Sequence, residues 1–265
     1  MELHLKEKSV VITGGSAGIG KAAALEFARE GARVSICGRT MSRLEETQKE
    51  FAAEGFSVDI YQTDVSDPDA LAAMADEVVK KAGSIDVWIN NAGLTVNKPV
   101  LEFTKEEYDR IMNTDLYAVF EGCRIAGRHM IKQGKGGVIL NASSYASKIP
   151  HTEGAIYAAA KAGVSSFTKT FAANFAPYGI RVIAFIPGMI ETEISRDAIR
   201  ENRQLYTQNV ALGRLGIPED LAKPLVFLAS DACSYITGVD IEISGGKYAV
   251  QNSRYSWDLV SAKEK

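Results

Sequence analysis

The chain has 265 residues, of which 46% are hydrophobic, and a formal net charge of −3 with a sequence pI near 5.8. This length and composition suffice to bury the core of a single α/β domain. The lysines and arginines are scattered along the chain, so we expect no basic surface for nucleic acid or for an anionic membrane.

Short runs of β-branched residues alternate with longer helical patterns from one end of the chain to the other. We expect strands near residues 9–13, 33–37, 58–63, 87–90, 137–141, 181–186 and 240–243. We expect helices near residues 19–30, 41–54, 67–82, 106–133, 152–175 and 218–229. This alternation predicts an α/β protein with one doubly wound, seven-stranded parallel sheet and helices on both faces. Because no linker or repeat interrupts the pattern, residues 1–265 are predicted to form one Rossmann-type domain.

Two segments without a strand pattern lie where function is expected. Residues 189–212 follow the strand that ends near Pro187, and ligands of open α/β sheets bind beyond the carboxyl ends of the strands. We therefore expect this segment to be a mobile lid over the substrate. Residues 247–265 form a tail after the last strand. The aromatic side chains Tyr255 and Trp257 are expected either to fray with the tail or to pack on a neighbouring subunit.

A glycine-rich turn follows the first strand and opens the first helix: Thr13-Gly14-Gly15-Ser16-Ala17-Gly18-Ile19-Gly20. Glycine permits positive φ and lets a pyrophosphate approach the helix N-terminus, where free N–H groups favour an anion. The spacing G-x-x-x-G-x-G differs from the fingerprint G-x-G-x-x-G, although the segment from Gly18 to Ala23 fits G-x-G-x-x-A. On these residues alone, a dinucleotide site and a plain tight turn both remain open.

Further along the chain, three side chains together indicate acid–base chemistry. Tyr157 and Lys161 are four residues apart on a predicted helix, so both side chains lie on one face and the ammonium can stabilise a phenolate. Ser144 follows an apolar strand, where its hydroxyl can hydrogen-bond a carbonyl oxygen as charge develops on it. Taken singly, the pattern Y-x-x-x-K also fits an ordinary amphipathic helix.

From Gly14 to Gly246 the combined motifs resemble those of the short-chain dehydrogenase/reductase family. The order and spacing of the following groups carry the resemblance: the glycine turn, Asp64-Val65, Asn90-Asn91-Ala92-Gly93, Asn113, Ser144, Tyr157-Ala158-Ala159-Ala160-Lys161 and Pro187-Gly188-Met189-Ile190-Glu191-Thr192. The resemblance implies an oxidoreductase that transfers a hydride between a nicotinamide and a carbonyl or secondary alcohol.

The resemblance also implies roles for individual residues. Tyr157 would be the general acid or base, Ser144 would polarise the substrate oxygen, and Lys161 would favour the phenolate and bind the nicotinamide ribose. Asn113 would hold a water in the proton relay. The implied cofactor contacts are Gly14, Ser16, Gly18, Ile19, Gly20, Arg39, Asp64, Val65, Asn90, Ala92, Gly93, Tyr157, Lys161, Pro187, Gly188, Ile190 and Thr192. The expected substrate contacts are Ser144, Tyr145, His151, Tyr157 and Met189.

The end of the second strand favours NADP(H) over NAD(H). NAD-specific dinucleotide folds usually have an Asp or Glu there, about 20 residues after the glycine turn, which accepts hydrogen bonds from the ribose hydroxyls. This chain has Gly38, followed by Arg39 and Thr40. Glycine leaves room for a 2′-phosphate, the guanidinium can pair with that phosphate, and Ser16 can add a hydrogen bond. The alternative is that Arg39 is a solvated turn residue.

Other classes of function fit the sequence less well. His4, His129 and His151 show no metal-ligand spacing, so we expect no metal site. Residues 142–146 form a degenerate nucleophile elbow with alanines in place of both glycines, but no histidine follows His151, as the hydrolase fold with that elbow requires. A catalytically silent nucleotide-binding protein remains the alternative of another class.

Two groups within the family resemble this chain most in length and motifs: bacterial 3-oxoacyl-(acyl carrier protein) reductases, and sugar or polyol dehydrogenases. Arg124, Arg128 and Lys132 form a row that either docks an acidic carrier protein or is a solvated helix face. Residues 171–176 offer no further cation. We therefore expect a small polar ketone, sugar or polyol as substrate, with the carrier-protein reductase as the alternative. The resemblance also implies a homotetramer, with a dimer as the alternative.

The cysteines and the first residues favour the cytoplasm. Cys37, Cys123 and Cys233 are far apart and form no C-x-x-C pair, which is typical of reduced thiols. The first residues contain no apolar signal-peptide region, and no window approaches the ~20 apolar residues that span a bilayer.

Overall fold

The computed structural model describes residues 2–263. Residue 1 of the predicted domain and residues 264–265 of the predicted tail lie outside this described part of the chain. Within that part, one parallel sheet has the strand order β3-β2-β1-β4-β5-β6-β7. Its strands are β1 (Ser9–Thr13), β2 (Arg33–Gly38), β3 (Val58–Gln62), β4 (Val87–Asn90), β5 (Gly137–Ala142), β6 (Ile180–Pro187) and β7 (Asp240–Ile243). The predicted α/β class and the seven-stranded parallel sheet are confirmed.

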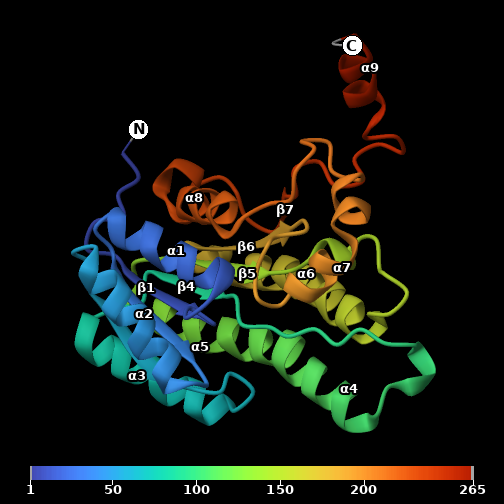
Figure 1. The fold of residues 1–265 in the computed structure, drawn as a ribbon. Helices are drawn as coiled ribbons and strands as arrows, with labels where there is room; N and C mark the ends of the chain where they lie inside the picture. Colours follow the sequence, from blue (N-terminus) through green and yellow to red (C-terminus); the bar gives the residue numbers. More distant parts are fainter. Residues whose placement is uncertain (1, 264–265) are drawn as a thin grey trace.

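Helices cover both faces of the sheet, as Figure 1 shows. The helices are α1 (Gly18–Arg29), α2 (Met41–Ala53), α3 (Pro68–Ala82), α4 (Lys105–Met112), α5 (Ala118–Gln133), α6 (Ala155–Phe175), α7 (Arg196–Thr207), α8 (Pro218–Ala229) and α9 (Tyr255–Lys263). Short helical turns are η1 (Val100–Glu102), η2 (Asn113–Tyr117), η3 (Tyr145–Ser147), η4 (Ala176–Tyr178) and η5 (Asp231–Cys233).

The central strands are buried on both faces, and their alternating side chains build two separate cores. Val10 and Ile12 of β1 pack with α1, α2 and α8, whereas Val11 packs with α3, α5 and α6. β1 is buried along its whole length, including its polar ends Ser9 and Thr13, because both of its faces are covered. The doubly wound arrangement therefore follows from the sequence pattern of its strands.

Local signals set the helix ends. The Asp67 side chain accepts hydrogen bonds from the backbone N–H groups of Asp69 and Ala70, and α3 ends at Gly83 in the left-handed conformation. Thr104 and Glu107 form a capping box at the start of α4. The predicted helix at 106–133 is wrong in one respect, because the π-helical turn η2 interrupts it between α4 and α5.

Helices α7 and α9 lie in the two segments for which the sequence pattern predicts no strand. α7 occupies half of the predicted lid and bends at Asn202, which has φ −142° and ψ 45°. α9 stands away from the body of the molecule (Figure 1). Tail and lid touch where Trp257 Nε1 donates a hydrogen bond to the backbone oxygen of Ala211, at 2.9 Å.

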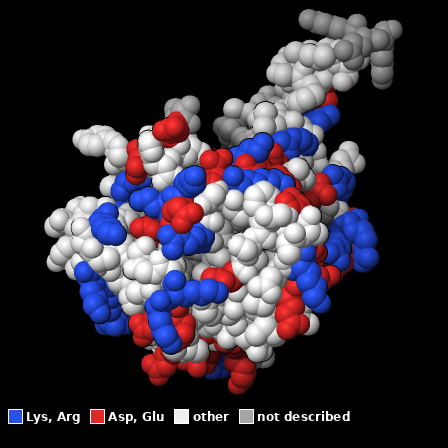
Figure 2. All heavy atoms as spheres, turned by 90° about the vertical axis from the view of Figure 1, so that its left-hand side faces the viewer, with Lys and Arg blue, Asp and Glu red and all other residues white. Residues whose placement is uncertain are grey.

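The surface carries charges of both signs. On the face shown in Figure 2, acidic and basic side chains are interspersed. Among the described helices, none is long and apolar enough to cross a membrane.

Candidate active site

The predicted cofactor contacts lie along the carboxyl edge of the sheet, in the turns that follow its strands. Gly14, Ser16, Gly18, Ile19 and Gly20 follow β1, Arg39 follows β2, Asp64 and Val65 follow β3, and Asn90, Ala92 and Gly93 end or follow β4. Pro187, Gly188, Ile190 and Thr192 end or follow β6. Parallel strands thus bring together residues that are up to 178 positions apart in the sequence.

The glycine turn is held against the turn that follows β4. Thr13 Oγ1 accepts hydrogen bonds from the backbone N–H groups of Asn91 (2.9 Å) and Ala92 (3.0 Å). Gly14 has φ 66°, and a Cβ there would lie 2.9 Å from the Ala92 Cα. A Cβ at Gly20 would lie 2.4 Å from the Gly14 oxygen. Only glycine fits these two positions.

This turn has the features of an anion cradle. No side chain caps α1, whose N-cap residue is Ala17, so the first N–H groups of the helix stay available to a ligand. A Cβ at Gly18 would lie 3.2 Å from Thr192 Cγ2, so Gly18 and Thr192 face each other across the groove. The residues present therefore fit a dinucleotide pyrophosphate.

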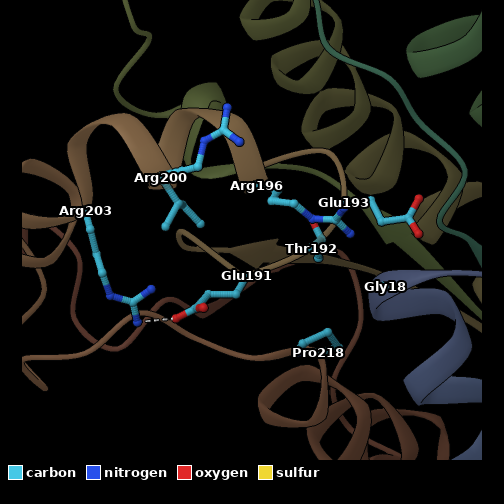
Figure 3. A pocket seen from close by; sticks show the side chains of 9 residues that line it. Gly18, Glu191, Thr192, Glu193, Arg196, Arg200, Arg203 and Pro218 are labelled. Atoms are coloured by element: carbon cyan, nitrogen blue, oxygen red, sulfur yellow. Dashed lines mark hydrogen bonds and ion pairs between the residues drawn. The ribbon is translucent and has the colours of Figure 1, made fainter.

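A pocket of about 590 Å³ extends from this groove under α7 (Figure 3). It is lined by Gly18, Glu191, Thr192, Glu193, Arg196, Ile199, Arg200, Arg203 and Pro218. Arg203 pairs with Glu191 at 2.6 Å, as drawn in Figure 3. Glu193 pairs with Arg43 of α2 at 2.9 Å, so an exposed ion pair links the lid to the opposite side of the groove.

The region at the end of β2 is open. Arg39 is exposed, and its backbone oxygen accepts a hydrogen bond from Gln62. A Cβ at Gly38 would lie 3.4 Å from Ser16 Oγ, so these two residues are neighbours. Asp64 is also exposed, and its carboxylate accepts hydrogen bonds from the backbone and side chain of Ser66. Val65 is buried.

Asn90 lies in a buried polar network. Its side chain accepts a hydrogen bond from Trp88 Nε1 (2.7 Å) and donates one to Asn141 Oδ1 (2.8 Å). Asn141 in turn donates to Thr168 Oγ1 of α6 (3.0 Å). These hydrogen bonds join β4, β5 and α6 below the site. Both the side-chain oxygen and the side-chain nitrogen of Asn90 are used inside the protein.

Ser144 and the helix of Tyr157 and Lys161 are joined through the neighbouring serine. Ser143 Oγ donates to the Lys161 backbone oxygen (3.0 Å), which holds α6 on the end of β5. Ser144 Oγ accepts a hydrogen bond from the Ala146 N–H (3.1 Å), so its O–H stays free to donate. Tyr157 is half-buried, and the Lys161 ammonium lies 5.6 Å from its ring centroid.

Lys161 is buried and forms an ion pair with the fully buried Asp115. Its Nζ lies 3.0 Å from Asp115 Oδ1 and 3.1 Å from the Ala142 oxygen, so two of its three donors are used. Burial lowers the pKa of Lys161, but the Asp115 carboxylate and Tyr157 together raise it by more, and the net pKa lies above its ordinary value. Burial also raises the pKa of Asp115, which the Lys161 ammonium partly offsets. A Cβ at Gly93 would lie 2.7 Å from Asp115 Oδ1, which explains the glycine there.

The structure places Asp115, and not Asn113, against Lys161. Asn113 is exposed at the start of η2, whereas Asp115, two residues later, faces Lys161. Asp115 lies four residues after the buried Ile111 and three before the buried Ala118, on the inner side of this helical segment. Sequence reasoning missed Asp115, and the only signal for it was an acidic residue in helical register with these apolar residues.

Two of the predicted substrate contacts, Tyr145 and His151, lie beside Ser144 and Tyr157. Tyr145 is buried directly after Ser144, and the exposed His151 places its ring 6.4 Å from that of Tyr157. The Met189 oxygen accepts a hydrogen bond from the Gly216 N–H. Two residues of the tail, Lys247 and Tyr248, also contact Tyr145, and sequence reasoning did not assign them to the site.

The remaining histidines are distant from this chemistry. His129 Nε2 lies 3.4 Å from Asp76, on the outer side of α5 and α3, and burial lowers its pKa. Among the described residues, no group of three or more His, Cys, Asp and Glu side chains is arranged to hold a metal ion.

Comparison of the sequence with family models and curated proteins identifies relatives along most of the chain. A family model described as Enoyl-(Acyl carrier protein) reductase matches residues 14–247. The chain is 40% identical over 246 residues to 3-oxoacyl-[acyl-carrier-protein] reductase FabG of Thermotoga maritima, covering 92% of this chain and 99% of that protein. It is 39% identical to 3beta-hydroxysteroid dehydrogenase 1 of Eggerthella lenta (91% and 94% covered). It is 38% identical to L-rhamnose 1-dehydrogenase (NAD(P)(+)) of Azotobacter vinelandii (92% and 98% covered).

Solved structures show the same fold. A short-chain type dehydrogenase/reductase from Mycobacterium marinum superimposes with a TM-score of 0.90 at 35% identity, covering 94% of this chain and 98% of that one. A proposed NAD(P)-dependent gluconate 5-dehydrogenase from Beutenbergia cavernae, which contains NADP, has a TM-score of 0.89 at 32% identity, covering 94% of this chain and 100% of that one.

Proposed function

Because this chain belongs to the short-chain dehydrogenase/reductase family, whose members are oxidoreductases that act on CH–OH groups with NAD(P), we propose that it interconverts a small polar ketone and its secondary alcohol with NADP(H). The bound nicotinamide would supply or accept the hydride. The observation that carries the proposal is the buried Lys161–Asp115 pair beside Tyr157, at the carboxyl edge of the sheet.

Residues of this chain would transfer the proton and stabilise the charges that form. Tyr157 exchanges the proton with the substrate oxygen, and the Lys161 ammonium stabilises the phenolate that results. Ser144 donates its free O–H to the same oxygen as charge develops on it. Lys161 keeps one donor for a ribose hydroxyl, and Asp115 holds Lys161 charged and oriented. We assign this positioning role to Asp115 in place of the relay role expected for Asn113.

The cofactor preference rests on Arg39, Gly38 and Ser16. Among residues 2–263, no carboxylate pairs with Arg39, and Gly38 leaves space beside Ser16 Oγ. A 2′-phosphate fits these groups, whereas a carboxylate at position 38 would repel it.

The test compares NADPH and NADH in wild type, Arg39→Ala and Gly38→Asp. We expect wild type to favour NADPH by about 10- to 100-fold in kcat/KM, which corresponds to one or two hydrogen bonds to a charged group. Both substitutions should weaken NADPH use selectively. A wild-type enzyme that used NADH equally well would contradict the preference.

The substrate is proposed to be a small polar ketone, sugar or polyol. The relatives named above act on acyl carrier proteins, steroids and sugars, so they share a reaction and differ in substrate. Arg124, the first cation of the candidate carrier-docking row, is already paired with Glu121 at 2.6 Å, which weakens the reductase alternative. An NADPH-consumption screen against ketoses, keto acids, diketones and short 3-oxoacyl thioesters distinguishes the small polar substrates from the 3-oxoacyl substrates of the alternative. If no carbonyl compound is reduced, the silent binding protein becomes the better interpretation.

Assembly and compartment are part of the same proposal. Three phenylalanine side chains, Phe120 of α5 and Phe167 and Phe171 of α6, are half-buried, with ring centroids 5.3 to 6.4 Å apart. This cluster supports a homotetramer packed on these two helices.

The three cysteines, Cys37, Cys123 and Cys233, are buried free thiols, which supports a reducing compartment such as the cytoplasm.

A further inference from the structure

The lysine at position 247 has a fixed backbone beside the active site. Gly245 and Gly246 have φ 64° and 73° and turn the chain back after β7. Lys247 then pairs with Val210 in an antiparallel β-bridge, and the Tyr248 N–H donates to the Asn209 oxygen at 2.8 Å. A Cβ at Gly245 would lie 2.9 Å from Val210 Cγ1, so the close approach requires glycine. The start of the tail is thus anchored on the end of the lid.

The side chain of Lys247 reaches between two tyrosine rings. Its Nζ lies 5.4 Å from the ring centroid of Tyr145 and 5.6 Å from that of Tyr248, and the two rings are 5.8 Å apart. Tyr145 directly follows Ser144, so the ammonium contacts the residue next to the serine that would bind the reacting oxygen.

A second group that can bind a polar ligand is His151, beside Tyr157. Burial, followed by the positive charge of Lys247, lowers the pKa of His151, and Glu153 opposes this only in part. At neutral pH the imidazole is neutral, with one N–H to donate, and its ring lies next to that of Tyr157.

The charge of Lys247 is not balanced by the protein. Burial lowers its pKa, and no acidic side chain raises it. Within residues 2–263 no carboxylate forms an ion pair with it. The neighbouring Glu242 is paired with Lys148 instead, and the other buried lysine, Lys161, has Asp115. A partly buried ammonium without a counter-charge is costly to the folded protein, so such groups are usually compensated by a ligand or used in function.

We propose that Lys247 binds a carboxylate of the substrate and that His151 adds a hydrogen bond to it, so that the enzyme acts on an oxo acid and its hydroxy acid. This inference rests on the proposed reaction and narrows its substrate class. One cation beside a neutral imidazole matches the single charge of a carboxylate, whereas a phosphate dianion would call for further cations. A lysine provides a point charge on a flexible stem, which suits an acid group held at some distance from the reacting carbonyl.

The test compares matched acids and esters with the full-length enzyme and NADPH. The acids are 2-oxobutanoate, 3-oxobutanoate, 4-oxopentanoate and 5-oxohexanoate, and each is paired with its methyl ester. We expect wild type to prefer at least one acid over its ester. Lys247→Met keeps the length of the stem and removes the charge, so it should lower kcat/KM for that acid by about 10- to 100-fold and change kcat/KM for the ester much less.

The control variant is Lys148→Met, which removes a nearby lysine whose charge Glu242 already balances. It should leave the acid-to-ester ratio close to that of wild type. The inference is wrong if Lys247→Met does not change the ratio, or if wild type prefers every ester. If both variants reduce esters at the wild-type rate, the proposed reaction stands whatever the result for the acids.

If the enzyme reduces none of these compounds, two measurements that need no turnover still test whether Lys247 binds a carboxylate. Calorimetric titration of the same four acids into the enzyme–NADP⁺ complex should detect binding to wild type and a loss of affinity in Lys247→Met. Without ligand, Lys247→Met should raise Tm by about 2 to 4 °C, because it removes an uncompensated ammonium. A lower Tm together with an equal loss of acid and ester activity would show that Lys247 is structural.

Discussion

At the scale of single residues, the sequence could place Tyr157 and Lys161 on one face of a helix, because their spacing of four residues is kept in any α-helix. Ser144 could also be identified from the sequence, since it comes two residues after the largely apolar strand β5. Asp115 and Lys247 could not be identified as site residues from the sequence. Their partners are 46 and 102 residues away, at Lys161 and Tyr145, and only the folded chain brings them together.

Tyr157→Phe removes the transferable proton and keeps the ring. We expect turnover to be abolished while the affinity for the cofactor stays nearly unchanged, as measured by steady-state kinetics and nucleotide titration. Tyr178→Phe, at an exposed tyrosine, is the matched control and should behave as wild type. Retention of more than roughly a tenth of the wild-type kcat, a loss of less than about 1.4 kcal/mol, would show that Tyr157 is not the general acid.

Asp115→Asn keeps the shape of the side chain and removes the charge that faces Lys161. Burial would then act on Lys161 without an opposing carboxylate, so its pKa should fall and the alkaline limb of kcat/KM should move to lower pH. The free energy of unfolding should fall by about 3 kcal/mol, because the buried ammonium is left unpaired. A pH–rate profile and urea unfolding measure these effects.

Asp109→Asn is the matched control for this variant, because Asp109 pairs with Lys105 on the exposed side of α4. An exposed pair contributes little, so neither the pH limb nor the unfolding midpoint should move. If Asp115→Asn behaved in the same way, Asp115 would have no positioning role.

At the scale of elements, the order of strands and helices could be predicted, and the break in the helix at residues 113–117 could not. Apolar periodicity reports the average period of a helix, and a single π-helical turn changes it too little to be seen. The choice of Asn113 came from the family resemblance, and the contact between Asp115 and Lys161 is visible only in the folded chain. The helix within the lid was missed for a different reason: α7 buries one residue, Ile199, and therefore has almost no apolar pattern.

The lid is anchored at its ends and weakly held in between. Bridges join Ile190 to Gly216 and Val210 to Lys247, whereas the middle depends on exposed ion pairs such as Arg43–Glu193. We expect hydrogen exchange over residues 191–208 to slow when cofactor and substrate are both bound. Exchange in α3, on the far side of the sheet, should not change. Equal exchange in the lid with and without ligands would contradict closure.

At the scale of the whole molecule, the fold class followed from the sequence, whereas the assembly depends on surfaces that no pattern within one chain defines. We expect light scattering to give the mass of four 28.6 kDa chains. Phe167→Glu should lower that mass, because it places a charge in the half-buried aromatic cluster between α5 and α6. A wild-type protein with the mass of a single chain would contradict the tetramer.

The strand order also determines what the chain can do while it is being made. β1 lies inside the sheet between β2 and β4, so four adjacent strands, β3-β2-β1-β4, are complete once residue 90 has left the ribosome. β5, β6 and β7 are then added one after another at a single edge. The glycine cradle therefore exists before the helix of Tyr157 is translated, and Lys247 arrives last. A growing chain therefore has the glycine side of its nucleotide groove first, its catalytic groups next, the Thr192 side of the groove after them, and the proposed substrate-binding lysine last.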